Sequence, residues 1–171
     1  IDASPEADAK VVVKGGGGAD IITASSSSNL GDTIEAGAGN DTINIATASF
    51  TSADVIDGGA GTDSISLSND SSVVDADFTN VTNVETLTAG ANKLLIATVD
   101  TLAAAAGITK ISLTDTGGND AITVKSGFTN ALTVDFDSDA SNANSVDASA
   151  YTGTLTVTAA DDELDTTAAT I

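Results

Sequence analysis

Five Asp-x-Ile triplets lie between Asp20 and Ile65, and three of them follow a glycine-rich turn. Those turns read GGGGAD (15–20), AGAGND (36–41) and GGAGTD (58–63). Glycines in such a turn allow positive φ and leave backbone carbonyls uncovered, while the aspartate supplies a carboxylate. Carboxylate and carbonyl oxygens are the ligands that Ca²⁺ takes in proteins. The residue types at this spacing therefore predict calcium binding.

The aspartates alternate between two series. Asp20, Asp41 and Asp63 recur at nearly constant spacing, and Asp32 and Asp54 fall between them. Each nonapeptide GGxGxDxUx, where U is apolar, is one tight turn plus one short strand, and two nonapeptides make one coil of a right-handed parallel β-roll. Turns on one edge then stack about 4.8 Å apart. One calcium ion, about 2.3–2.6 Å from each ligand oxygen, can bridge two stacked carboxylates that would otherwise repel.

We expect calcium between Asp20 and Asp41, and between Asp41 and Asp63. The expected carbonyl ligands are Gly16, Gly18, Gly37, Gly39, Gly59 and Gly61. The other edge has lost its glycines, so Asp32 and Asp54 are secondary metal candidates. Asp120, within DTGGNDAIT (115–123), is a further candidate. The alternative is a stack of metal-free turns, because Gly and Asp both favour turns for conformational reasons, but that explains single turns and not their repetition.

Composition narrows the function further. Twenty-five acidic residues stand against five basic ones, which gives a net charge of -20 and a pI of about 4.1. The absence of a basic patch argues against a nucleic-acid partner. The chain has no His and no Cys, so it cannot form a His-containing catalytic triad or a Cys nucleophile, and we expect no enzyme. Because so acidic a chain opposes its own compaction, we expect calcium binding and folding to be one event.

Residues beyond Ser68 keep strand character without the tight turn motif. Short runs rich in Thr, Val, Ile and Leu alternate with Ser, Asn, Asp and Gly, which is typical of an all-β chain. Parallel strands need crossovers, and the coils of a solenoid supply them. VDTLAAAA (99–106) predicts one short helix that stops at Gly107. The predicted fold is thus all-β, a right-handed parallel β-roll or β-solenoid with one short helix.

The expected organisation is a fragment, 1–171, of one continuous β-solenoid. It comprises a calcium β-roll over 14–67, an irregular β-solenoid over 68–145 and the start of a second copy of the unit over 146–171. The second copy is inferred because IDAS (1–4) and VDAS (146–149) begin similar stretches, which puts Asp165 opposite Asp20. No apolar run is long enough to cross a bilayer, so no transmembrane segment is expected.

Residues 14–66 resemble the RTX (repeats-in-toxin) family of calcium-binding nonapeptides. VTNVETLTAG, AAAAGITKISL and VDASAYTGTLTVTA resemble the β-solenoid bodies of RTX-type bacterial surface-layer (S-layer) proteins. The resemblance implies a secreted Gram-negative protein that is exported unfolded by type I secretion and folds on external calcium. It further implies a structural role at the bacterial cell surface, as an S-layer or matrix protein, with lateral self-assembly into a homo-oligomer through calcium contacts.

Two other functions fit the same residues. The chain could be the repeat stalk of a large RTX adhesin, or the non-catalytic calcium-binding tail of a secreted hydrolase. Another region of the protein could also bind cell-surface polysaccharide. A catalytic motif or a discrete ligand-binding domain elsewhere in the full-length protein would separate these alternatives.

Overall fold

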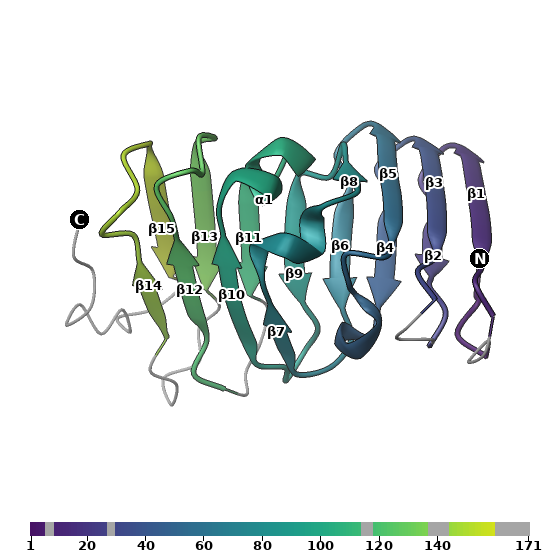
Figure 1. The fold of residues 1–171 in the computed structure, drawn as a ribbon, viewed down its shortest axis with the longest axis horizontal. Helices are drawn as coiled ribbons and strands as arrows, with labels where there is room; N and C mark the ends of the chain where they lie inside the picture. Colours follow the sequence, from purple (N-terminus) through teal and green to yellow (C-terminus); the bar gives the residue numbers. More distant parts are fainter. Residues whose placement is uncertain (6–8, 27–29, 114–117, 137–143, 160–171) are drawn as a thin grey trace.

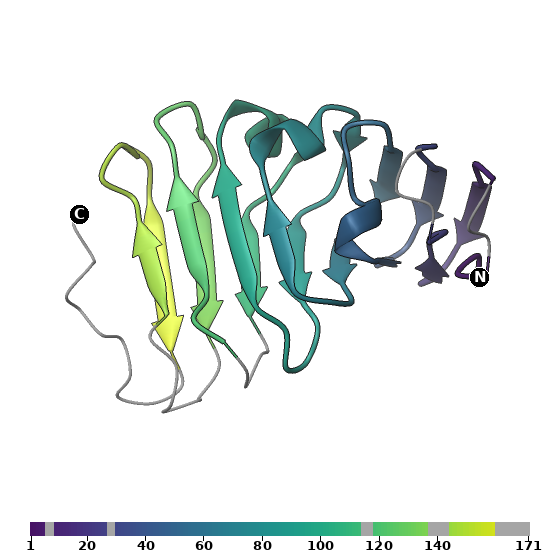
Figure 2. The ribbon, with the colours of Figure 1, turned by 60° about the horizontal axis from the view of Figure 1, so that its bottom comes forward.

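A computed structural model describes residues 1–5, 9–26, 30–113, 118–136 and 144–159. Successive coils stack along the long axis of the molecule (Figure 1), and every strand pairing among the described residues is parallel. The molecule is a β-solenoid of about six turns with almost no helix, as predicted. Figure 2 shows the same stacking from another direction. No helix of the described residues is both long and apolar enough to span a membrane.

The strands form three sheets, which are the walls of the solenoid. Wall A runs the whole length in the order β15-β13-β11-β9-β6-β4-β2, wall B is β1-β3-β5-β8, and wall C is β14-β12-β10-β7. The strands of wall A are β2 (Ile21–Thr23), β4 (Thr42–Ile45), β6 (Ser64–Leu67), β9 (Thr86–Ala89), β11 (Lys110–Leu113), β13 (Leu132–Phe136) and β15 (Leu155–Ala159). Those of wall B are β1 (Val12–Gly17), β3 (Thr33–Ala38), β5 (Val55–Ala60) and β8 (Val81–Thr82). Those of wall C are β7 (Ser71–Val73), β10 (Leu95–Val99), β12 (Ala121–Val124) and β14 (Ser145–Asp147).

Apolar side chains on alternate strand positions point inward and stack from coil to coil. In wall A, one such column is fully buried over its first six members, which are Ile22, Ile43, Ile65, Leu87, Ile111 and Val134. Each member sits on the residue of the next coil, so apolar contact runs along the axis rather than across a globular centre. The core is therefore a set of stacked columns whose order depends on the register of the coils.

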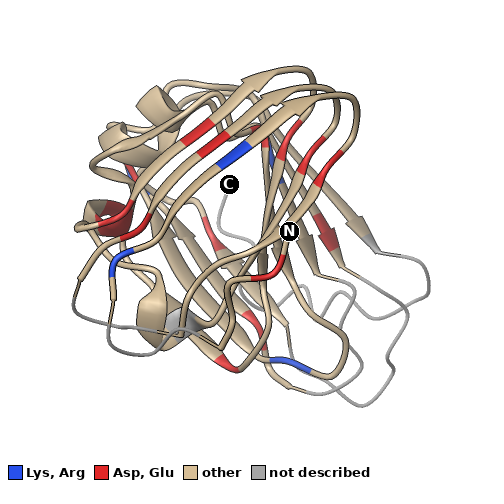
Figure 3. Cartoon of the chain, turned by 90° about the vertical axis from the view of Figure 1, so that its right-hand side faces the viewer, with Lys and Arg blue, Asp and Glu red and all other residues tan. Residues whose placement is uncertain are grey.

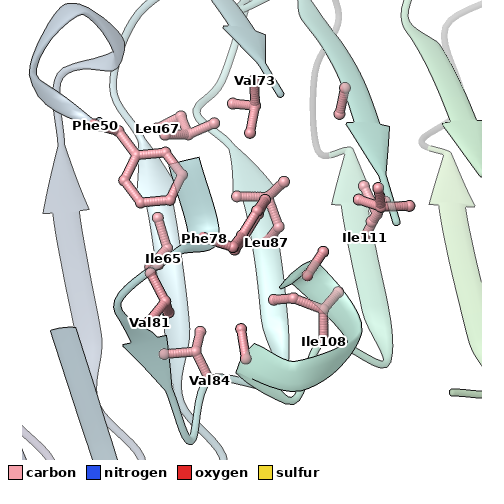
Figure 4. Packing of buried hydrophobic residues seen from close by; sticks show 14 of the residues in the cluster. Phe50, Ile65, Leu67, Val73, Phe78, Val81, Val84, Leu87, Ile108 and Ile111 are labelled. Carbon is pink, nitrogen blue, oxygen red and sulfur yellow. The ribbon is translucent and has the colours of Figure 1, made fainter. Parts of the chain in front are cut away.

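Three short helical segments lie in the connections between strands. They are η1 (Thr47–Ser49), η2 (Asp75–Phe78) and α1 (Thr101–Ala106). Phe50, which follows η1, packs edge-on against Phe78 with ring centroids 5.4 Å apart, and both side chains are buried in the core (Figure 4). These larger side chains fill the interior where wall B ends and wall C begins.

The predicted helix is present but shorter than expected. It begins at Thr101, because Val99 is the last residue of β10 and Asp100 turns the chain, and it ends at Gly107 in the left-handed conformation (φ 109°). The segments IDAS and VDAS make the same local turn, in which Asp2 accepts the N–H of Ser4 and Asp147 that of Ser149. They lie on different walls, however, since Asp2 bridges to Thr23 of wall A and Asp147 belongs to wall C. The second copy stays a prediction, and Asp165 lies outside the described residues.

Candidate metal centre

The glycine edge, defined as residues 15–20, 36–41 and 58–63, joins wall B to wall A in three successive coils. Six glycines there have positive φ, at Gly16, Gly18, Gly37, Gly39, Gly59 and Gly61. The turns also stack closely. A Cβ on Gly37 would stand 2.1 Å from the carbonyl oxygen of Gly16, and one on Gly59 would stand 1.9 Å from that of Gly37. Only glycine allows both this backbone conformation and this approach, and the result is a column of carbonyl oxygens along the edge.

Beside that column the carboxylates form an acid ladder. The backbone N–H of Asp20 donates to Oδ1 of Asp41 over 2.7 Å, and the N–H of Asp41 donates to Oδ1 of Asp63 over 2.7 Å. Each rung therefore binds the next through one carboxylate oxygen. These bonds place the three predicted metal ligands Asp20, Asp41 and Asp63 next to one another in successive coils.

The second oxygen of each ladder carboxylate has no partner. Oδ2 of Asp20, of Asp41 and of Asp63 is buried without a hydrogen bond, and Asp41 and Asp63 are only 1% and 0% exposed. The pKa of the Asp63 carboxyl is raised, mainly by burial and further by the negative charges of Asp41, Glu85 and Asp57. The hydrogen bond from the N–H of Asp41 lowers this pKa but does not outweigh those causes. Unpartnered buried carboxylate oxygens are costly, so these three oxygens are suited to a positively charged ligand.

A calcium ion fits this donor set. Carboxylate and carbonyl oxygens are hard ligands of the kind that Ca²⁺ takes, and a divalent cation reverses the effect of crowded carboxylates on each other's ionisation. Asp20, Asp41, Asp63 and the turn carbonyls are the residues that would hold it. In the part of the chain that the structure describes, no three acidic side chains form a metal cluster. The ladder instead offers carboxylates from adjacent rungs together with backbone oxygens.

The loop edge, where Asp32 and Asp54 begin β3 and β5, is built differently. Asp32 accepts the N–H of Val11 at Oδ1 and that of Ser25 at Oδ2, over 3.0 and 2.9 Å. Asp54 accepts the N–H of Asp32 at Oδ1 and that of Thr51 at Oδ2, over 2.8 and 2.7 Å. Both oxygens of each carboxylate therefore already satisfy backbone groups. Neither carboxylate has an oxygen without a hydrogen-bond partner, so this geometry gives no support to calcium at Asp32 and Asp54, which stays a prediction.

Asp120 lies apart from both edges, at the start of β12 in wall C. Its Oδ1 accepts the N–H of Leu95 over 2.7 Å, and its own N–H donates to Oδ1 of Asn144 over 2.9 Å. Asp120 thus binds the backbone of the preceding coil, as the aspartates of both edges do. The side chain that binds its own N–H from the following coil is an amide, that of Asn144, and not a carboxylate. Calcium binding at Asp120 stays a prediction.

Two acids that sequence reasoning did not assign to a site have defined roles. Glu85 accepts the N–H of Asp63 at Oε2 over 2.7 Å and so becomes the fourth rung of the acid ladder. The signal was present in the sequence, because Glu85 follows Asp63 by the 22 residues that separate Asp41 from Asp63. Asp75 of η2 accepts N–H groups of Asp100, Leu102 and Ala103. It thereby caps α1 from the neighbouring coil, and no local motif indicates that contact.

Residues 12–30, 26–44 and 51–74 match the RTX calcium-binding nonapeptide repeat (4 copies). Residues 12–74 are therefore named the RTX segment. The match includes all three glycine turns and both edges. RTX nonapeptide repeats bind Ca²⁺, so calcium is the ion of this segment, and the segment is a calcium-binding β-roll with a structural role. Searches of curated proteins and of solved structures returned no match to this chain.

Proposed function

We propose that this chain is a calcium-binding structural segment of a secreted bacterial surface-layer or cell-surface matrix protein, which folds and assembles when it meets external calcium. The observation that carries the proposal is the acid ladder. Three carboxylates in adjacent coils each keep one buried oxygen without a partner, and a cation is the species that satisfies all of them. Binding energy at these sites is then folding energy.

The charge distribution supports calcium-dependent folding. Seen from the N-terminal end, acidic segments recur from coil to coil and far outnumber basic ones (Figure 3). A chain with a net charge of -20 repels itself when compact. Export in an unfolded state, through a type I system, is compatible with low calcium inside the cell and higher calcium outside. The proposed role is structural and not catalytic.

Folding is tested by circular dichroism of the purified chain during calcium titration and again after addition of chelator. We expect the β signal to be gained and lost reversibly. The single tyrosine, Tyr151, packs on Phe128 with ring centroids 6.0 Å apart, so its near-ultraviolet signal reports whether order spreads from the RTX segment to the C-terminal coils. An unchanged β signal in metal-free buffer would contradict calcium-coupled folding.

Assembly is tested separately by electron microscopy and light scattering at saturating calcium. Growth of two-dimensional sheets that dissolve in chelator is expected for a surface-layer segment. A folded chain that stays monomeric at saturating calcium would contradict assembly by this segment and favour the repeat stalk of an adhesin or the calcium-binding tail of a hydrolase.

A further inference from the structure

The acid ladder does not end with the last glycine turn. Glu85 contacts Asp63 as Asp63 contacts Asp41, through one carboxylate oxygen on the backbone N–H of the previous rung, and both bonds measure 2.7 Å. Glu85 lies in the corner between β8 and β9, outside the residues that match the RTX repeat. A fourth carboxylate therefore stands in line with three that are oriented for calcium.

The surroundings of Asp63 reproduce those of Asp20. A Cβ on Gly15 would stand 2.2 Å from the carbonyl oxygen of Ala36, one coil onward, and 2.7 Å from Oδ2 of Asp20. A Cβ on Gly58 would stand 2.0 Å from the carbonyl oxygen of Asn83, one coil onward, and 2.9 Å from Oδ2 of Asp63. In both places an unpartnered carboxylate oxygen and a carbonyl oxygen of the next coil converge on the same point beside a glycine.

Asn83 adopts the backbone conformation that such a corner requires. Its φ is 54°, in the left-handed region that Asn tolerates better than most residues with a side chain. Asp63 itself is fully buried, and its Oδ2 has no hydrogen-bond partner. The junction thus combines an orphaned buried oxygen, a second carboxylate and a backbone carbonyl.

We propose that Asp63, Glu85 and the carbonyl oxygen of Asn83 form an additional calcium site, at the junction between the RTX segment and the C-terminal coils. The inference rests on the proposed calcium-dependent function of the ladder. This site has fewer protein oxygens than those between two glycine turns, because Val84 is buried in the core where the earlier coils carry glycines. Water would complete the coordination, so the ion at this site binds more weakly than the others.

The test is the number and affinity of calcium ions bound by the full chain, measured by equilibrium dialysis with radioactive calcium. Glu85→Gln keeps an acceptor for the N–H of Asp63 but removes the charge. We expect it to bind one ion fewer than the wild type, or to bind its weakest ion at least tenfold less tightly. Glu35→Gln is the matched control, because Glu35 is an exposed acid that pairs with Lys14 on the outside of wall B, and it should match the wild type.

Equal numbers and affinities in wild type and Glu85→Gln would overturn the additional site and leave Glu85 as a backbone cap alone. A wild-type chain that binds no calcium would overturn the proposed function and this site with it. The anomalous signal of calcium in a crystal of the wild-type chain gives a second readout that needs no variant. A peak between the carboxylates of Asp63 and Glu85 supports the site, and peaks only between glycine turns overturn it.

Discussion

The two edges of the RTX segment start from the same Asp-x-Ile triplet and use it in different ways. On the glycine edge, Asp41 and Asp63 each accept the backbone N–H of the preceding rung at one carboxylate oxygen, and the other oxygen is buried without a partner. On the loop edge, Asp32 and Asp54 satisfy backbone N–H groups with both oxygens. The triplet sets where a carboxylate enters the coil, and the turn before it decides what the carboxylate binds.

The difference follows from what precedes each aspartate. Stacked glycine turns direct carbonyl oxygens along the edge, so an oxygen of the following aspartate has no N–H group to accept from and is the one that we expect to bind calcium. The longer connections of the loop edge bring N–H groups instead, such as that of Thr51, which donates to Asp54 three residues onward. Within these two edges, the number of oxygen partners distinguishes the carboxylates that we propose as calcium ligands from those that cap the backbone.

The largest effect is expected from Gly37→Ala, which breaks the glycine edge itself. The substitution places a Cβ 2.1 Å from the carbonyl oxygen of Gly16 at a φ of 113°. The backbone conformation alone costs about 1–3 kcal/mol, and the overlap forces the coils apart, so calcium affinity should fall with stability. Urea unfolding at saturating calcium, followed by circular dichroism, measures the loss.

Gly17→Ala is the matched control. A Cβ at Gly17 would have no atom within 4 Å and no positive φ is required there. It should change stability by no more than about 0.5 kcal/mol. Similar losses in the two variants would show that stacking at the glycine edge is not what Gly37 provides.

The next effect separates the two edges directly. Asp41→Asn removes a charge that faces two proposed calcium sites, so we expect its calcium midpoint in a circular dichroism titration to rise at least tenfold, with partial recovery at high calcium. Asp54→Asn should lose about 1–2 kcal/mol at every calcium concentration, because an amide cannot accept from both Asp32 and Thr51 as the carboxylate does. Since folding is coupled to calcium binding, this loss raises the calcium midpoint as well, but by less than in Asp41→Asn. Equal shifts of the midpoint in both variants would contradict the distinction between the edges.

A smaller effect, without calcium dependence, is expected outside the RTX segment. Asp75→Ala leaves the N–H groups of Asp100, Leu102 and Ala103 without their acceptor and should cost about 2 kcal/mol, a value near the upper end for loss of a helix cap. Asp70→Ala removes a single bond of 3.2 Å at the exposed start of β7 and serves as control. Thermal unfolding at saturating calcium measures both. The same measurement at limiting calcium should give the same loss for Asp75→Ala relative to the wild type, and a loss that disappears only at high calcium would contradict a purely capping role.

The smallest effect is expected where a carboxylate is exposed. The hydroxyl of Thr158, and secondarily Lys110, hold the pKa of Asp135 below its ordinary value of 3.8. Its contribution to stability is therefore present above pH 3.8 and is lost as the pH falls through the lower folded-state value. Because the pair with Lys110 is about 40% exposed, the contribution should be less than about 1 kcal/mol. Carbon-13 NMR titration should show this pKa rising in Thr158→Val, and no change would contradict the assignment.

Sequence reasoning reached the β-solenoid and the short helix, both of which the structure confirms, and it picked out Asp20, Asp41 and Asp63, which the structure brings together. It reached these because the repeat is local, with turn, acid and apolar residue inside nine positions. It missed Glu85 as a rung of the acid ladder. The corner VTNVE keeps the 22-residue spacing from Asp63 but has neither the glycines nor the aspartate of the nonapeptide motif. Sequence reasoning missed the cap from Asp75 because the contact joins residues 25 to 28 positions apart.

The amino-acid sequence is enough to predict the period of the coils, the side chains that stack inside them and calcium as the ligand, since each depends on residues close together along the chain. The stacking of the coils in three dimensions sets which carboxylate oxygens remain without a partner, where wall B gives way to wall C, and how far the acid ladder extends. Those properties depend on what the next coil brings against each residue, and that contact is set by register across more than twenty residues.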